Sequence, residues 1–294
     1  MVLHSTVCRF EHFLEPWYGY WALMLGLDDP SLPIAERNIH RKVWEYSAIA
    51  EALSGRHVLG PGKKGLGFAV GREPLISLFA GMGANVLATD TPDPGVSALW
   101  KSDNQHASSA TDLLFDKLID RDSFEKRVQF EYADMRQLEK FEPASFDFIW
   151  SACALEHLGS LEAGHRFIRD SATLLRAGGV AAHTTEYNVF SDDDTLLLPN
   201  QVIYRRRDIK AIAKDLAHRG FRVGPIDFDS GNHKYDLEFD LPPWCTTGRK
   251  HVKLKLGPFI ATSILLILER PSESGIPRRN QLSPERDGEA MRKE

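Results

Sequence analysis

The stretch Gly62-Lys-Lys-Gly-Leu-Gly-Phe-Ala-Val-Gly-Arg-Glu-Pro-Leu75 contains four glycines in ten positions, followed by a proline and an apolar run. Its pattern predicts a buried strand over 65–70, a turn at Gly71 and a helix over 73–80, where Pro74 is tolerated in the first turn. Glycine lets the backbone approach a ligand closely. The free N–H groups at the start of the helix point to the same place. We therefore expect a ligand-binding loop here.

Strands and helices alternate along the rest of the chain. The expected strands are 65–70, 84–90, 128–134, 146–151, 180–185, 221–228 and 259–268. The expected helices are 73–80, 107–119, 161–175 and 207–219. This alternation predicts an α/β fold with a Rossmann-like, doubly wound, mostly parallel seven-stranded sheet and helices on both faces. No convincing helix separates the last two strands, so we expect the last strand to be antiparallel.

The segments outside this alternation set the expected domain organisation. Residues 1–57 are rich in aromatic side chains and predicted to be mostly helical, as a cap that packs on the body or covers a cleft. The body is expected over 58–270, with a rim insertion at 231–257 that fits a lid or a homodimer contact. The polar tail 271–294 is expected to be disordered.

Composition narrows the class of protein. Of 294 residues, 43% are hydrophobic and 26% charged, which is typical of a soluble globular chain. The net charge of -5 gives no global basic field for nucleic acid. Neither a signal peptide nor an apolar run long enough to span a bilayer is visible, so we expect a cytoplasmic protein. Three distant cysteines without CxxC spacing argue against a disulfide framework and against a zinc site: Cys8, Cys153 and Cys245.

Two acidic residues at strand ends indicate an adenosine-containing cofactor. Asp90 ends the second strand about twenty residues after the glycine loop, where a carboxylate accepts hydrogen bonds from ribose hydroxyls. Asp134 follows the third strand and could accept from the adenine amino group, while Met135 packs on the ring. A carboxylate that only caps the next turn is the plain alternative for Asp134, and it weakens when Gly71 and Asp90 are taken together.

Two cofactors compete for this loop. A nicotinamide dinucleotide needs G-x-G-x-x-G, and Val70 stands where the last of these glycines belongs. S-adenosylmethionine (SAM) has no pyrophosphate and tolerates a looser loop. A Walker A loop is excluded because no G-K-[ST] follows a strand.

From Gly65 to Thr185 the chain resembles the class I SAM-dependent methyltransferases. The motifs are the glycine loop, Asp90, Ala133-Asp-Met135, Phe146-Asp-Phe-Ile-Trp-Ser-Ala-Cys-Ala-Leu-Glu-His-Leu-Gly159 and Leu174-Leu-Arg-Ala-Gly-Gly-Val180. The wider chain is similar to a bacterial subgroup linked to surface-glycan and secondary-metabolite gene clusters. That likeness lies in 65–74, in His183-Thr-Thr-Glu-Tyr-Asn188 and in Tyr204-Arg-Arg-Arg-Asp208. The resemblance implies methyl transfer from SAM, and O-methylation of a hydroxylated or sugar-containing acceptor.

The glycine loop departs from the family pattern. Gly67 stands where an acid normally ends the first strand, Ala69 replaces the first glycine and Glu73 replaces the third. Only Gly71 is retained. Glu73 could bind the methionine ammonium and Arg72 the carboxylate, or the two could pair with each other at the surface.

The resemblance places the reactive methyl group near the fourth and fifth strands. His157 and His183 lie at the ends of these two strands, and either is a candidate general base for a hydroxyl acceptor. A helix-start residue bonded to backbone and a packing residue are the plain alternatives for the two histidines. Ser151 and Glu156 are expected to face the cofactor.

Polar residues after the fifth strand are candidate acceptor ligands. Glu186 and Asn188 could hold sugar hydroxyls, and Arg205 with Arg206 could bind a phosphate or carboxylate on the acceptor. A charged helix start is the plain alternative for the arginines. The acids at 192–194 splay apart, so we expect a solvated loop and predict no metal.

Three other functions stay open. A SAM-binding enzyme with this altered loop could catalyse cyclisation or a lyase reaction instead of methylation. The fold could also serve as a non-catalytic binding module, which the strand-end acids Asp90, Asp134 and Glu156 argue against. A dehydrogenase is disfavoured by the incomplete glycine motif.

Overall fold

The structure is a computed structural model that describes residues 2–92, 106–246 and 248–272. The predicted disorder of the tail concerns residues that lie almost wholly outside this range. Among the described residues, no helix is long and apolar enough to cross a membrane.

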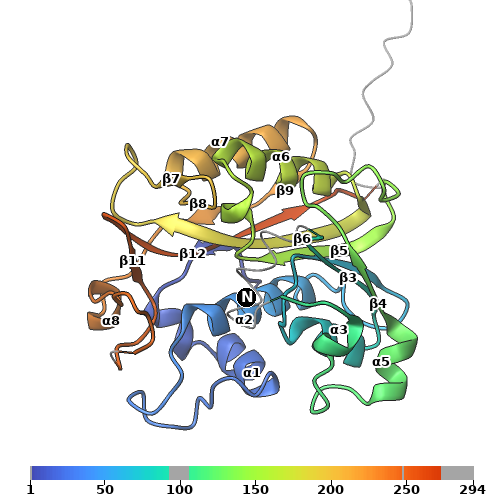
Figure 1. The fold of residues 1–294 in the computed structure, drawn as a ribbon, viewed down its shortest axis with the longest axis horizontal. Helices are drawn as coiled ribbons and strands as arrows, with labels where there is room; N and C mark the ends of the chain where they lie inside the picture. Colours follow the sequence, from blue (N-terminus) through green and yellow to red (C-terminus); the bar gives the residue numbers. More distant parts are fainter. Residues whose placement is uncertain (1, 93–105, 247, 273–294) are drawn as a thin grey trace, which may run out of the picture.

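One ten-stranded sheet forms the centre of the molecule (Figure 1). Its strands are β1 (Ser5–Val7), β2 (Lys64–Phe68), β3 (Asn85–Asp90), β4 (Val128–Tyr132), β5 (Phe146–Ala152), β6 (Leu175–Asn188), β9 (Arg222–Val223), β10 (Ile226–Asp227), β11 (Leu254–Leu256) and β12 (Phe259–Glu269). The order is β10-β1-β12-β6-β5-β2-β3-β4, with β9 and β11 also on β12. Strands β2 to β6 are parallel and β12 is antiparallel to β6, so the expected fold class is confirmed.

Helices cover both faces of the sheet. On one face lie α1 (Pro16–Met24), α2 (Arg41–Ser54), α3 (Leu75–Gly81) and α5 (Arg121–Arg127); on the other lie α6 (Leu161–Ala172) and α7 (Arg206–His218) (Figure 1). Short elements are η1 (Phe10–Leu14), η2 (Ala110–Leu113), η3 (Leu155–His157), α8 (Lys234–Leu237) and the pair β7 (Leu197–Leu198) and β8 (Gln201–Val202). The two faces hold two separate large apolar clusters.

The sheet has more strands than the predicted seven because its far edge is built differently. The expected strand 221–228 is two short strands, β9 and β10, since Pro225 between them has no N–H for a ladder bond. Between β10 and β12 lies β1, whose Thr6 pairs with Leu265. The N-terminal segment, predicted to be mostly helical, therefore also contributes a strand to the sheet.

The predicted helix over 107–119 is wrong. Only η2 forms there, and α5 begins after Asp120, whose side chain accepts a hydrogen bond from the Ser123 N–H. The Ser77 hydroxyl of α3 donates to the Leu113 carbonyl and accepts from the Phe115 N–H. These bonds use backbone groups that a helix would need, so tertiary contacts override the helical periodicity.

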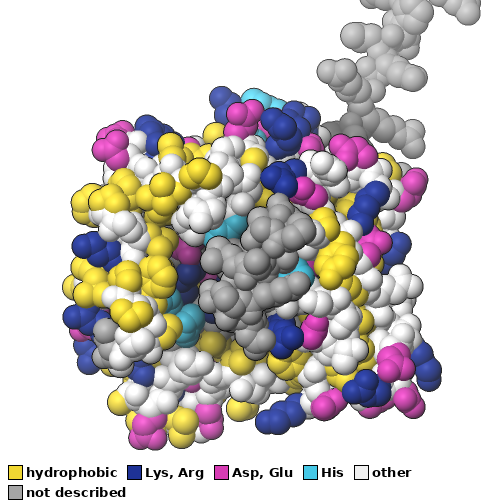
Figure 2. Space-filling model, viewed as in Figure 1, with side chains coloured by type: hydrophobic (Ala, Val, Ile, Leu, Met, Phe, Trp, Pro, Cys, Tyr) yellow, Lys and Arg dark blue, Asp and Glu magenta, His cyan; other side chains and the backbone are white. Residues whose placement is uncertain are grey.

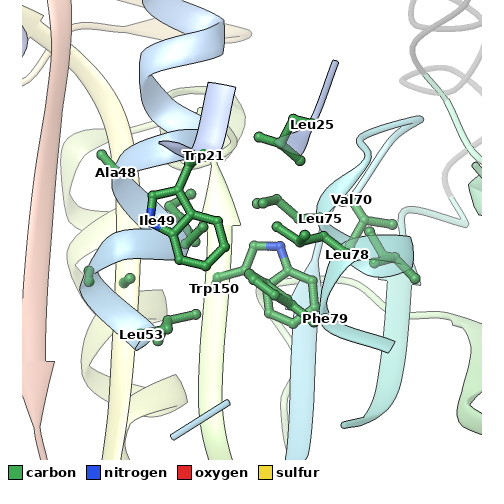
Figure 3. Packing of buried hydrophobic residues seen from close by; sticks show 14 of the residues in the cluster. Trp21, Leu25, Ala48, Ile49, Leu53, Val70, Leu75, Leu78, Phe79 and Trp150 are labelled. Atoms are coloured by element: carbon green, nitrogen blue, oxygen red, sulfur yellow. The ribbon is translucent and has the colours of Figure 1, made fainter. Parts of the chain in front are cut away.

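The first two glycines of the predicted strand 65–70 serve packing. A Cβ on Gly67 would lie 2.5 Å from the Trp150 ring, and one on Gly65 would overlap the Phe148 ring. Trp150 meets Phe79 of α3 edge-on at 5.1 Å between ring centroids, inside the apolar cluster that α2 and α3 share (Figure 3). The G-x-G pattern therefore reflects aromatic side chains of β5 lying across β2.

Candidate active site

The cofactor end of the site forms where β2 and β3 end. Gly71 has a φ of 52°, in the left-handed region that glycine adopts without steric cost. Its N–H donates a hydrogen bond to Asp90 Oδ2 at 3.2 Å. Asp90 also accepts from the N–H groups of Thr91 and Ala107, at 2.7 and 3.1 Å. Burial raises the pKa of Asp90. The structure thus brings together the glycine and the acid that the sequence singled out.

A histidine that sequence reasoning missed lies beside Asp90. His106 is buried, its Nε2 lies 3.2 Å from the Thr91 carbonyl, and Nδ1 has no hydrogen-bond partner among the described residues. If Nε2 donates to this carbonyl, Nδ1 is an acceptor. Two acceptors, Asp90 and His106, then suit the two hydroxyls of a ribose. No motif in the sequence marks His106.

Arg72 and Glu73 do not pair with each other. Arg72 binds Asp112 at 2.8 Å, whereas Glu73 is 3% exposed and accepts from the Trp150 indole at 2.5 Å. Burial raises the pKa of Glu73 to about 8. The surface pairing considered from the sequence is therefore wrong, and the ammonium contact of Glu73 stays a prediction.

Asp134 and Met135 lie after β4, as predicted. Asp134 forms a bidentate ion pair with Arg136, 2.7 Å at its shortest, and this bond lowers the pKa of the carboxyl. Met135 is buried in the apolar cluster on the α6 side of the sheet. Their contacts with adenine stay predictions.

Ser151 and His183 are neighbours on β5 and β6. The Ser151 hydroxyl lies 2.9 Å from His183 Nδ1, and the His183 ring packs edge-on against Phe167 of α6. Burial lowers the pKa of His183 to about 3, and its buried Nε2 has no partner among the described residues. A neutral imidazole with so low a pKa is a weak base. The role of His183 as general base stays a prediction.

His157 lies apart from His183, in η3. Its Nδ1 is 2.8 Å from the Asn200 carbonyl, and burial lowers the pKa of the ring. The preceding Glu156 is buried, accepts from the Thr185 hydroxyl at 2.8 Å and has a pKa raised by burial. The backbone contact expected as the plain alternative for His157 is thus present.

The N-terminal helix α2 contributes charged residues that sequence reasoning missed. Arg41 binds Glu45 at 3.1 Å and Glu186 of β6 at 2.5 Å. Lys42 also binds Glu45, at 2.7 Å. The Cys153 thiol, directly after β5, donates to Glu45 at 3.1 Å. These contacts join α2 to the carboxyl ends of β5 and β6, and no local motif could reveal them.

The carboxyl groups of this cluster differ in their protonation. Burial opposes the charge on Glu45, yet Lys42 and Arg41 lower its pKa to about 2. For Glu186 burial dominates and raises the pKa to about 7, although Arg41 acts against it. Glu186 Oε2 and Arg41 Nε are buried and have no partner among the described residues. On the face shown in Figure 2, basic, acidic and histidine side chains gather in a hollow near the middle.

The side chains of the other predicted acceptor residues have partners other than Glu186. The Asn188 amide holds its own loop, donating to the Asp194 carbonyl and accepting from the Phe190 N–H at 2.8 Å. Arg205 binds Asp208 at the start of α7, and Arg206 lies over the Phe228 ring at 4.9 Å. Their roles toward an acceptor stay predictions.

Residues 66–183 match the family described as "Methyltransferase domain". This region is a SAM-dependent methyltransferase domain. It contains the glycine loop, both strand-end acids, Glu156 and His183. The cofactor of the methyltransferase is therefore SAM, and the ribose contact of Asp90 stays a prediction.

Several solved structures resemble the methyltransferase at low identity. A proposed sarcosine dimethylglycine methyltransferase from Galdieria sulphuraria has 15% identity and a TM-score of 0.47, covering 87% of this chain and 99% of its own. The [4+2]-cyclase SpnF has 14% identity and a TM-score of 0.47, covering 78% and 84%.

The 1,6-didemethyltoxoflavin-N1-methyltransferase of Burkholderia thailandensis, with S-adenosylhomocysteine bound, has 14% identity and a TM-score of 0.45, covering 80% of both chains. No curated protein matches the chain.

A cavity of about 470 Å³ lies away from this site, against α1 and the segment that follows it. Its lining is largely apolar and includes Leu14, Tyr20 and Leu32. It contains none of the strand-end groups, so we assign the chemistry to the strand ends and not to this cavity.

Proposed function

We propose that the methyltransferase transfers the methyl group of SAM to a hydroxyl oxygen of a small hydroxylated acceptor, such as a sugar-containing molecule. The observation that carries this proposal is the buried ion pair of Arg41 and Glu186. It leaves one donor, Arg41 Nε, and one acceptor, Glu186 Oε2, without partners among the described residues. Most buried polar atoms in native proteins have partners, so an unpartnered donor and an unpartnered acceptor on one ion pair favour a ligand.

A hydroxyl suits this pair better than other nucleophiles. It donates one hydrogen bond and accepts through two lone pairs. One lone pair can accept from Arg41 Nε while the other attacks the methyl group, and the proton faces Glu186. A neutral amine has a single lone pair, which methylation itself needs. An ammonium cannot accept from Arg41, and a carboxylate cannot donate to Glu186.

In this proposal the side chains orient the acceptor and remove the proton of its hydroxyl group. When bound, SAM supplies an electrophilic methyl group on its sulfonium. Glu186 takes the hydroxyl proton as the carbon–oxygen bond forms, and its pKa of about 7 suits a base near neutral pH. Arg41 orients the acceptor oxygen through Nε. Glu45, ionised and bonded to Arg41, Lys42 and Ser263, fixes the position of the guanidinium.

The cofactor end is assigned as the sequence predicted, with one addition. We place SAM against Gly71, Glu73, Asp90, Asp134, Met135, Ser151 and Glu156, and add His106. Residues 1–57 act as a cap that contributes Arg41 to the domain over 58–270, and 231–257 forms the rim.

We also propose an acceptor from glycan or secondary-metabolite biosynthesis, and a cytoplasmic location, which suits three free thiols. A homodimer would cover exposed apolar side chains of α1 such as Tyr20 and Leu23. Light scattering at two protein concentrations tests the dimer.

The test of the function compares matched acceptors. Purified protein is incubated with SAM carrying a trideuterated methyl group and with pairs of small molecules that differ only in a hydroxyl or an amine at one position. Mass spectrometry of the products is expected to show the label on hydroxylated members. Label only on the amines would overturn the hydroxyl assignment, and no label with SAM bound would favour a non-methylating function.

A further inference from the structure

We propose that the protein binds a zinc-type divalent cation between the start of α2 and the rim insertion, through His40, Cys245 and His251. Ligand atoms of these three residues lie within 4.8 Å of one another. Cys245 Sγ is 3.5 Å from His40 Nε2. In a tetrahedral zinc site the Zn–S and Zn–N bond lengths separate a sulfur from a nitrogen by about 3.6 Å. The spacing of Cys245 Sγ and His40 Nε2 therefore already fits one ion.

A buried carboxylate orients two of the three ligands. Asp240 Oδ2 lies 2.8 Å from His251 Nδ1 and accepts from the Cys245 N–H at 2.7 Å. With Nδ1 bonded to a carboxylate, His251 presents Nε2 as the ligand atom, an arrangement common behind metal-bound histidines. Asp240 is fully buried and His251 is 6% exposed, so both positions are fixed by packing.

The backbone holds the two histidines side by side. Arg41 N–H donates to the His251 carbonyl at 2.8 Å, and His251 N–H donates to the Ile39 carbonyl at 3.0 Å. The two rings stack with centroids 4.4 Å apart. One ion would thus tie the first turn of α2 to a loop more than two hundred residues later.

Binding at His40 would change one hydrogen bond. In the structure His40 Nδ1 accepts from the Lys42 N–H at 3.0 Å, which puts the ring proton on Nε2. A metal on Nε2 requires that proton on Nδ1 instead, so the Lys42 N–H must turn to another acceptor. Loading is therefore coupled to the start of α2, and the Cys245 thiol loses its proton as the metal binds.

The donor set selects the class of cation. One thiolate with two imidazoles favours zinc or cobalt over magnesium or calcium, which prefer oxygen ligands. Cys245 is solvent-exposed, which gives the ion an entry path and leaves a fourth position for water. The sequence predicted no metal because the ligands follow no short spacing motif.

A second group of potential ligands defines the competing outcome. Cys153, Glu156 and Glu186 also offer atoms within 4.8 Å of one another. Arg41 is bonded to Glu186 and disfavours a cation there. Cys153, Glu156 and Glu186 lie at the proposed methyl-transfer site (the transfer site), beside Arg41. The site formed by His40, Cys245 and His251 does not depend on the proposed methyl transfer.

The test is a cobalt titration of the metal-free full-length protein under reducing conditions. We expect one equivalent of Co²⁺ to give a thiolate charge-transfer band and tetrahedral d–d bands, which Zn²⁺ removes. Cys245→Ser abolishes the charge-transfer band, and Asp240→Asn weakens binding about 10–100-fold. His218→Gln, an exposed histidine in the last turn of α7, leaves the titration unchanged.

Three results would overturn the proposal. The first is the absence of a thiolate band in the wild type. The second is a band that survives in the Cys245→Ser variant. This substitution is at an exposed position, and thermal melting should show that the variant is folded. The third is a band lost in Cys153→Ser but kept in Cys245→Ser, which places the ion at the transfer site.

Discussion

The two ends of the active site differ in how far apart in the sequence their bonded residues lie. At the cofactor end, Asp90 is bonded to three backbone N–H groups that lie within twenty residues of it. At the acceptor end, Arg41 and Glu186 come from segments 145 residues apart and still leave two atoms unpartnered. The cofactor end is formed by a strand, a loop and a helix that are close together in the sequence. The acceptor end is formed only by tertiary contacts. We propose that the acceptor binds at the two unpartnered atoms of Arg41 and Glu186.

The largest expected effect comes from a substitution that disrupts the acceptor end and leaves the cofactor end intact. Glu186→Gln keeps the size of the side chain and an oxygen for Arg41 but removes the base, so kcat should fall by about 10²–10⁴-fold. The dissociation constant of S-adenosylhomocysteine, measured by calorimetry, should stay the same. Glu162→Gln, on the exposed side of α6, is the matched control. A kcat near that of the wild type would exclude Glu186 as the base.

The next largest effect comes from a substitution that disrupts the cofactor end. Asp90→Ala removes a charged acceptor worth about 1.5–3 kcal/mol per hydrogen bond, so the dissociation constant of S-adenosylhomocysteine should rise about 10–150-fold. Calorimetric titration measures it, with the exposed Asp116→Ala as control. Unchanged affinity in a folded Asp90→Ala protein would remove Asp90 from the ribose site.

A smaller effect tests why the glycine loop looks as it does. Gly65→Ala places a methyl group inside the Phe148 ring and should lower the free energy of unfolding by about 1–3 kcal/mol. Gly224→Ala meets only ordinary contacts and should change it by less than about 0.5 kcal/mol. Urea unfolding compares them. If Gly65→Ala were as stable as Gly224→Ala, the packing explanation would fail.

The last effect is spread over several pH units and concerns Glu73. Its pKa of about 8 lies above the ordinary value of 4.5, so the folded state keeps a proton that the unfolded state loses. Stability should therefore fall as pH rises from about 4.5 to about 8, by at most about 1.4 kcal/mol per pH unit from this group. Glu73→Gln should flatten that decline in urea unfolding series. An equal slope in both proteins would show that Glu73 ionises normally.

The sequence predicted the parts of the molecule that depend on local pattern. The alternation of strands and helices, the antiparallel β12, and the placing of Gly71 and Asp90 at adjoining strand ends are confirmed. Apolar periodicity and strand-end chemistry suffice for these. The helix over 107–119 failed because Ser77 takes two of its backbone groups, a contact that periodicity cannot show.

Only half of the proposed acceptor end could be predicted: the sequence singled out Glu186 but not its partner Arg41. Arg41 and Glu45 lie on a helix with no recognisable motif, and their burial against β5 and β6 arises only when the chain folds. Besides Glu186, the sequence singled out Asn188 and Arg205, which are polar and close to the predicted strand 180–185 but are bonded within their own loops. Polarity near a strand end therefore does not separate ligand contacts from loop contacts.

The most direct test of the central claim is the pH dependence of kcat/KM with a hydroxylated acceptor. The wild type should rise with pH to a plateau, with an apparent pKa of about 7 that belongs to Glu186. Glu186→Gln should lose this limb along with most of its activity. The same limb in Glu186→Gln would contradict the account and place the base elsewhere, with His157 the next candidate.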